Sequence, residues 1–148
     1  MEQNNLVEEI NQLLKGSHMG AYVFQDLKEK LKSKELRDVF DQILDNLHTH
    51  ERALTALVIS EHGDPQDSAG VKGTIADFMQ SVKNMALSND KEILDEAVKA
   101  MEMAIKAIKD FDEKHFTLKE DMEKTIRIMM DDYSSTYHML HKFSIEYR

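Results

Sequence analysis

The sequence predicts an all-α fold, a bundle of four long helices with one long connection between the second and the third. Apolar residues recur at steps of three and four over most of the chain, which is the spacing of one helix face, and no strand pattern competes. The residues that interrupt helices gather in one place, since the only Pro and three of the five Gly fall within 63–73. With 148 residues the chain has the size of one domain, which we place over 1–148.

The first two predicted helices cover about 3–32 and 35–62, and at 1.5 Å per residue each is about 40 Å long. The chain can turn between them near Lys32, so they are expected to pack antiparallel. The apolar face of the first helix is interrupted by Ser17 and Gly20, and that of the second by His50. The other residues on these two faces are Leu6, Ile10, Leu13, Phe24, Leu27 and Leu31, then Leu36, Phe40, Ile43, Leu47, Leu54 and Leu57.

Three further helices are predicted over 71–87, 90–112 and 117–147. Asn89 three residues before Glu92, and Thr117 three residues before Glu120, are both typical of a helix start. The long connection that carries the short helix favours a ferritin-like bundle, the class of four-helix bundle with one long crossover. An up-down-up-down bundle is the alternative, but it needs only short loops and leaves the helix at 71–87 unexplained.

Composition narrows the classes of function. The 28 acidic and 19 basic residues give a net charge of -9, which argues against a nucleic-acid partner and against an anionic membrane surface. The chain has no Cys, so disulfides, thiolate metal ligands and thiol nucleophiles are excluded. The first residues lack the basic and apolar segments of a signal peptide, and no apolar run approaches the roughly 20 residues of a membrane span. We therefore expect a cytoplasmic protein.

Several local patterns carry a family resemblance over nearly the whole chain. They are Leu13-Leu14 with Gly20 and Tyr22, Lys34-Glu35-Leu36, Leu54 followed by His62-Gly63-Asp64-Pro65, and the run from Asp90 to Glu96. In these patterns the chain resembles an uncharacterised bacterial family of ferritin-like bundles, a domain of unknown function. The resemblance implies a fold related to rubrerythrin and ferritin, and it implies no established reaction or ligand.

Ferritin-like di-iron proteins indicate where a metal site would lie, since a Glu from each of two helices joins a Glu-x-x-His pair from each of the other two. The second predicted helix offers Asp45 and His48 at this spacing, but its apolar face runs through Leu47, so the pair is expected at the surface. There it could hold a divalent cation or simply form a solvated face. If His50 is the ligand instead, the residue three positions earlier is Leu47, and the carboxylate is missing.

The last predicted helix breaks the di-iron motif as well. His138 and His141 are three residues apart and can chelate as a pair, but Ser135 precedes His138 where the motif needs Glu. Unpaired carboxylates in a core are costly without a cation, so a di-iron protein would show them on its apolar faces. No intact di-iron centre is expected, and the metal candidates are His50, His48, Asp45, His138 and His141.

Ser17 and His50 form a predicted polar notch in the core, because they lie about level when the first two helices fold back on each other. One interpretation is a buried neutral His50 hydrogen-bonded to Ser17, a carbonyl or a water. The other is a small polar cavity in which His50 holds an ion, a water or a small ligand. The further side chains considered for such a cavity are His18, His141, Tyr22 and Tyr137.

The function that the sequence favours is that of a non-enzymatic ferritin-like bundle acting through self-association or a protein partner. Apolar and aromatic residues beyond the needs of one core face are the candidates for that contact: Met130, Tyr137, Met139 and Tyr147. The alternative is a metal-binding or rubrerythrin-type oxidoreductase protein with an atypical, His-dominated site. No cofactor is expected under the first interpretation. Under the second, the expected cofactor is a transition metal.

Overall fold

The computed structural model describes residues 2–66, 77, 80–82, 84, 89–115 and 117–147. Four long helices account for most of them: α1 over Glu2–Lys30, α2 over Lys34–Ser60, α4 over Asp90–Lys114 and α5 over Glu120–Glu146. This part of the chain contains no strand, so the predicted all-α class is confirmed for it.

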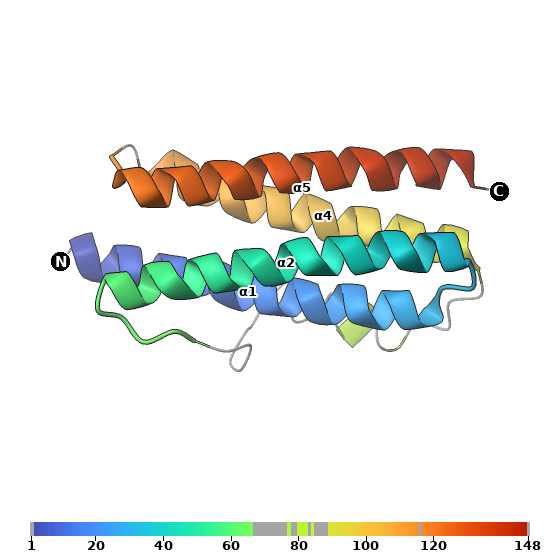
Figure 1. Cartoon of the computed structure of the whole chain (residues 1–148), viewed down its shortest axis with the longest axis horizontal. Helices are drawn as coiled ribbons and strands as arrows, with labels where there is room; N and C mark the ends of the chain where they lie inside the picture. Colours follow the sequence, from blue (N-terminus) through green and yellow to red (C-terminus); the bar gives the residue numbers. More distant parts are fainter. Residues whose placement is uncertain are drawn as a thin grey trace.

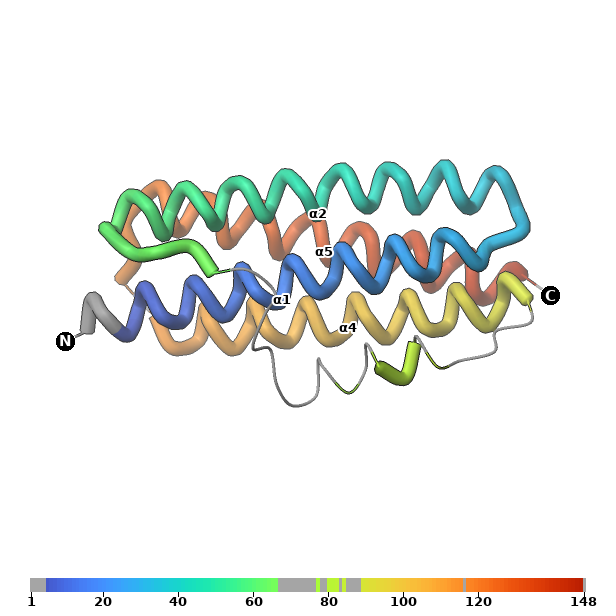
Figure 2. The backbone as a smooth tube through the Cα atoms, turned by 90° about the horizontal axis from the view of Figure 1, so that it is seen from below, coloured from blue at the N-terminus to red at the C-terminus, as the bar shows by residue number. Residues whose placement is uncertain are grey.

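The four helices lie side by side along one axis (Figure 1). α1 packs on α2 and α4 packs on α5, and the two pairs meet through α1 against α4 and α2 against α5. α2 and α4 run in the same direction, so α2 ends at the end of the molecule opposite to the start of α4, as the tube in Figure 2 shows. The chain between Ser60 and Asp90 therefore joins opposite ends.

The start of the last helix differs from the sequence analysis in an informative way. Thr117 was expected to cap the last helix, and this prediction is wrong: α5 begins at Glu120, and the residue at its N-cap is Lys119, whose side chain makes no capping hydrogen bond to the helix. The predicted helix at 71–87 falls for the most part outside the described residues. Those of it that are described are helical, and among them Val82 is fully buried in the core.

The core consists of the apolar helix faces that the steps of three and four in the sequence predict. Phe24 of α1 and Phe40 of α2 lie at its centre, both fully buried, with ring centroids 5.5 Å apart. Burying one such side chain stabilises a fold by about 1.5–3 kcal/mol relative to leaving it in water. The other large side chains with almost no exposure are Ile10, Leu14, Leu27, Leu36, Leu54, Ile93, Leu94, Met101, Ile108 and Met122.

Polar groups close the end of the molecule where α4 starts. The Asp90 carboxylate is buried and accepts hydrogen bonds from the backbone N–H groups of Lys32 (2.8 Å) and Ser33 (2.9 Å) in the turn between α1 and α2. It also accepts one from the Tyr147 hydroxyl at 3.3 Å. The α1–α2 turn, the start of α4 and the end of α5 are therefore tied together by one carboxylate.

At the opposite end, α2 stops in a Schellman motif. The Gly63 N–H donates to the Val58 carbonyl (2.9 Å) and the His62 N–H to the Ile59 carbonyl (3.0 Å), with His62 in the left-handed region at φ 63°. A Cβ on Gly63 would lie 2.5 Å from a methyl group of Val7. Only glycine allows this close approach to α1, so the chain that follows α2 stays in contact with α1.

Candidate functional site

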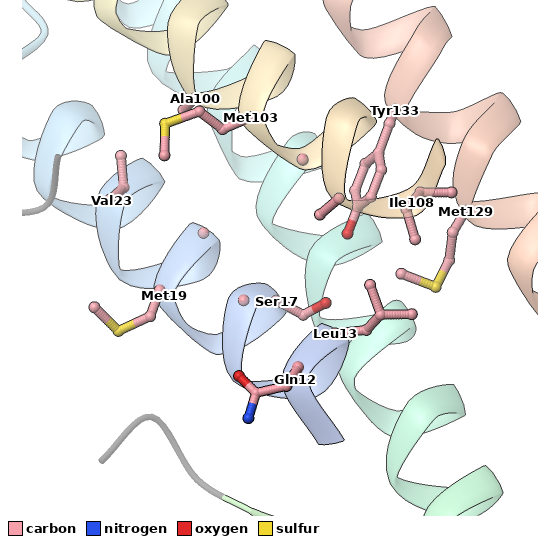
Figure 3. A pocket seen from close by; sticks show the side chains of 14 residues that line it. Gln12, Leu13, Ser17, Met19, Val23, Ala100, Met103, Ile108, Met129 and Tyr133 are labelled. Carbon is pink, nitrogen blue, oxygen red and sulfur yellow. The ribbon is translucent and has the colours of Figure 1, made fainter. Parts of the chain in front are cut away.

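A pocket of about 80 Å³ lies between α1, α4 and α5. Small residues leave this space: Gly16 and Gly20 on α1 face Ala100 and Ala104 on α4, and a Cβ added at Gly20 would meet no atom within 4 Å. The small residues make this the Ala-rich face of α4, and the structure keeps a pocket there. Figure 3 shows it, and its other lining residues are Gln12, Leu13, Ser17, Met19, Val23, Met103, Ala107, Ile108, Met129 and Tyr133.

Two hydroxyl groups form the polar part of the wall. Tyr133 of α5 is only 4% exposed, and in Figure 3 its hydroxyl points toward Ser17 of α1, which is 4% exposed. Burial raises the pKa of Tyr133 to about 12; the hydrogen bond with Ser17 works against this rise, and the charges of Glu51 and Asp132 add to it. The Tyr133 hydroxyl therefore stays neutral over the whole physiological range of pH.

His50 lies behind Tyr133, away from the residues that line the pocket. The edge of one ring meets the face of the other, with centroids 5.1 Å apart and planes at 85°. His50 is 2% exposed, and its Nε2 lies 2.7 Å from Oδ2 of Asp132 on α5. Because a carboxylate only accepts, Nε2 carries the proton in this bond. Nδ1 is buried and has no hydrogen-bond partner among the residues that the structure describes.

The structure thus brings Ser17 and His50 to the same side chain, Tyr133, which contacts both. Neither of the tyrosines that the sequence analysis considered takes this place. Tyr22 is 52% exposed on α1, and Tyr137 lies one turn beyond Tyr133, with its ring against His138.

The other candidate metal ligands lie apart from His50. Nδ1 of His48 is 2.8 Å from Glu51 Oε1, and the second oxygen of Glu51 pairs with His18 on α1. Asp45 is exposed on the same helix, where its carbonyl accepts the hydroxyl of Thr49 at 3.0 Å. The predicted pair of Asp45 and His48 is therefore replaced by a carboxylate between two imidazoles.

His138 and His141 are exposed on α5 and flank Tyr137, with ring centroids 5.6 Å and 5.7 Å from it. The candidate ligands are thus spread over three places. Among the residues that the structure describes, no group of three or more His, Asp or Glu side chains is arranged to hold a metal ion.

A further carboxylate has a shifted pKa outside the pocket. Asp95 of α4 accepts hydrogen bonds from Ser144 of α5 and from Lys91, whose Nζ lies 3.0 Å from it. Burial alone would raise the pKa of Asp95, but the bonds from Ser144 and Lys91 and the charges of Lys91 and Lys99 outweigh it and lower the pKa. This cluster is a structural tie between α4 and α5.

Sequence reasoning missed the pocket and two of its neighbours, Asp132 and Tyr133, as site residues. Tyr133 is buried in the core, and its hydroxyl was not among the candidate groups predicted from the sequence. The available signal was the acidic residue directly before it, since Asp132 reaches the imidazole that Tyr133 covers.

A sequence model of a protein family described as "Domain of unknown function (DUF2383)" matches residues 5–114 of the chain. The match includes Ser17, His50 and the Ala-rich face of α4, whereas α5 with Asp132 and Tyr133 lies beyond it. No curated protein and no solved structure matches the chain. Of the helices described above, none has both the length and the apolar character that a membrane crossing requires.

Proposed function

The chain belongs to the DUF2383 family, a domain of unknown function, and from the geometry of its pocket we propose that it is a non-enzymatic protein that binds a small uncharged molecule between α1, α4 and α5. The observation that carries this proposal is the composition of the wall: of the 14 lining residues that belong to the described part of the chain, none is charged. An ion would lose its hydration there without gaining a partner, which is costly.

The size of the pocket limits the molecule. A cavity of about 150 Å³ holds benzene, with its six heavy atoms. On that scale the 80 Å³ here accommodate about three or four heavy atoms. Met19, Met103 and Met129 line the space, and their flexible thioether side chains can rearrange around occupants of different shape.

The chemistry of the wall favours binding over catalysis. The hydroxyl groups that the described lining residues bring to it belong to Ser17 and Tyr133 alone, and a general acid or base works best with a pKa near the operating pH. At about 12, the pKa of Tyr133 is far from that range. Burial thus leaves Tyr133 as a neutral hydrogen-bonding group.

The order of the helices supports a finer assignment of the fold, a ferritin-like bundle with a long crossover. Parallel α2 and α4 require a connection that joins opposite ends, which a plain up-down-up-down bundle does not have. Self-association and an atypical metal site stay predictions. The four residues considered for self-association, Met130, Tyr137, Met139 and Tyr147, are partly buried against the protein's own core.

Xenon tests the proposed pocket, since this apolar atom enters preformed apolar cavities. We expect saturable changes in the methyl NMR signals of Met19, Met103 and Met129 when the intact chain is equilibrated with rising xenon pressure. The signal of Met122, which is buried in the core away from the pocket, should stay within experimental error.

A matched pair of variants gives the control. Ala104→Met fills the pocket and should abolish the response, whereas Ala56→Met adds the same side chain at an exposed site on α2 and should leave it intact. Unchanged methyl signals in the wild-type chain at the highest pressure would contradict the proposal, and so would a full response in Ala104→Met.

A further inference from the structure

We infer that the molecule bound in this pocket is a short aliphatic alcohol, whose hydroxyl group is recognised by Tyr133 and Ser17. This inference rests on the proposed function, because it names the class of molecule that the same pocket takes. Three features of the wall support it: where its polar atoms lie, how many hydrogen bonds they can make, and how Tyr133 is held.

The polar atoms lie together in the depth of the pocket. Of the described residues that line the pocket, only Gln12, Ser17 and Tyr133 bring polar side-chain atoms to the wall, and Gln12 is exposed to solvent. The hydroxyls of Ser17 and Tyr133 face each other from α1 and α5 (Figure 3). The other side chains among the described lining residues are aliphatic or thioethers.

Hydrogen-bond counting then selects the ligand group. The two wall hydroxyls have two O–H donors, and when the hydroxyls pair with each other only one donor is used. The second O–H needs an acceptor, and an oxygen lone pair remains for a donor. A hydroxyl group supplies both at once, whereas a hydrocarbon supplies neither and leaves buried polar groups unsatisfied.

Charge excludes the related ionic ligands. The negative charges of Glu51 and Asp132 act on Tyr133 and would repel a carboxylate placed beside its hydroxyl. An ammonium group would find no carboxylate among the lining residues. A neutral alcohol avoids both costs.

The Tyr133 hydroxyl is fixed before any ligand arrives. Its ring packs against His50, and the same imidazole bonds to Asp132, the residue that precedes Tyr133 on α5. A donor that is already held in place loses little freedom on binding, so each hydrogen bond to it contributes more to affinity.

The experiment compares two probes of nearly equal shape, propan-2-ol and 2-methylpropane, in which a hydroxyl replaces a methyl group. Dissociation constants are measured from the methyl NMR shifts of Met19, Met103 and Met129. We expect Tyr133→Phe to weaken the binding of propan-2-ol by about 3- to 10-fold, the range that one net hydrogen bond gives. The binding of 2-methylpropane should change by less than twofold.

Two further variants keep the result clear. Ser17→Ala should act on the two probes in the same selective way, which also serves if Tyr133→Phe disturbs packing. Tyr22→Phe makes the same change at a residue that does not line the pocket and should leave both constants unchanged.

The failures of the two proposals are distinguishable. If neither propan-2-ol nor 2-methylpropane binds to the wild-type chain, the proposed pocket itself is wrong. If both bind, but Tyr133→Phe and Ser17→Ala affect both probes equally or neither, the pocket stands and the assignment of an alcohol is overturned.

Discussion

At the scale of single residues, Tyr133 connects the two polar features of this molecule. Its hydroxyl faces the pocket beside Ser17, while its ring covers the imidazole of His50. One side chain therefore joins α1, α2 and α5. A change in the protonation of Tyr133 therefore affects both the pocket and His50, and the shifted pKa of Tyr133 makes that change measurable.

The raised pKa of Tyr133 predicts a loss of stability at high pH. Below pH 10 the phenol is neutral in both the folded and the unfolded chain, so its contribution is fully present. Between pH 10 and about 12 the unfolded chain ionises first, and the free energy of unfolding falls by about 3 kcal/mol. Urea denaturation of wild type and Tyr133→Phe across this range measures the difference between them.

The matched control for this titration is Tyr22→Phe, because Tyr22 is 52% exposed. That variant should follow the wild-type curve, while Tyr133→Phe should lose less stability above pH 10. Parallel curves for wild type and Tyr133→Phe would show that Tyr133 ionises as easily in the folded chain as in the unfolded one.

Burial at this scale was predictable from the sequence, but the partners of the buried groups were not. The apolar spacing placed Ser17 and His50 on inward faces, where the structure also has them. It could not choose between Tyr133 and Tyr137, since both lie on one side of α5 a single turn apart. That choice depends on the rotation and shift of α5 against α2, which tertiary packing determines.

At the scale of helices, the bond between His50 and Asp132 joins α2 to α5. Asp132→Ala removes the acceptor of the buried Nε2–H, in an imidazole whose Nδ1 already has no partner in the described part of the chain. We expect the free energy of unfolding to fall by about 2 kcal/mol, as for other hydrogen bonds to charged groups. Chemical denaturation of the intact chain at neutral pH measures this loss.

Asp131→Ala is the control for that measurement, because Asp131 is the neighbouring acidic residue on α5 and is exposed. Its effect should stay within about 0.5 kcal/mol, as for most surface substitutions. Equal effects of the two variants would mean that water replaces the carboxylate at His50. Because the Asp132 side chain is 39% exposed, water can reach this position, and the comparison tests whether water takes the place of the carboxylate.

Helix ends show which local signals the sequence carries reliably. Asn89 caps α4 through its own side chain, which accepts from the Glu92 N–H at 2.9 Å, so sequence spacing alone locates it. Thr117 offered the same spacing, yet α5 starts later, at Glu120. Lys119 instead pairs with the buried Glu61 at 2.9 Å, a long-range contact that no local pattern reveals.

At the scale of the whole molecule, the charge of -9 predicts that salt stabilises the fold. Folding brings like charges together, and their repulsion is screened as the Debye length falls from about 30 Å at 0.01 M to about 8 Å at 0.15 M. Surface ion pairs such as Lys106 with Asp110 weaken at the same time, but each contributes under about 1 kcal/mol. The melting temperature should rise by about 3 °C between 0.01 and 0.15 M potassium chloride.

A charge variant separates this whole-molecule repulsion from specific ion binding. Replacing the exposed residues Asp38, Glu102, Asp112 and Asp131 by Lys changes the formal charge from -9 to -1 without touching the core or the pocket. With little net charge left to screen, the variant should melt at a temperature that salt hardly raises. A wild-type melting temperature that stays flat or falls with salt would mean that local ion pairs outweigh net repulsion. An equal rise in both proteins would point instead to an ion bound at a particular site.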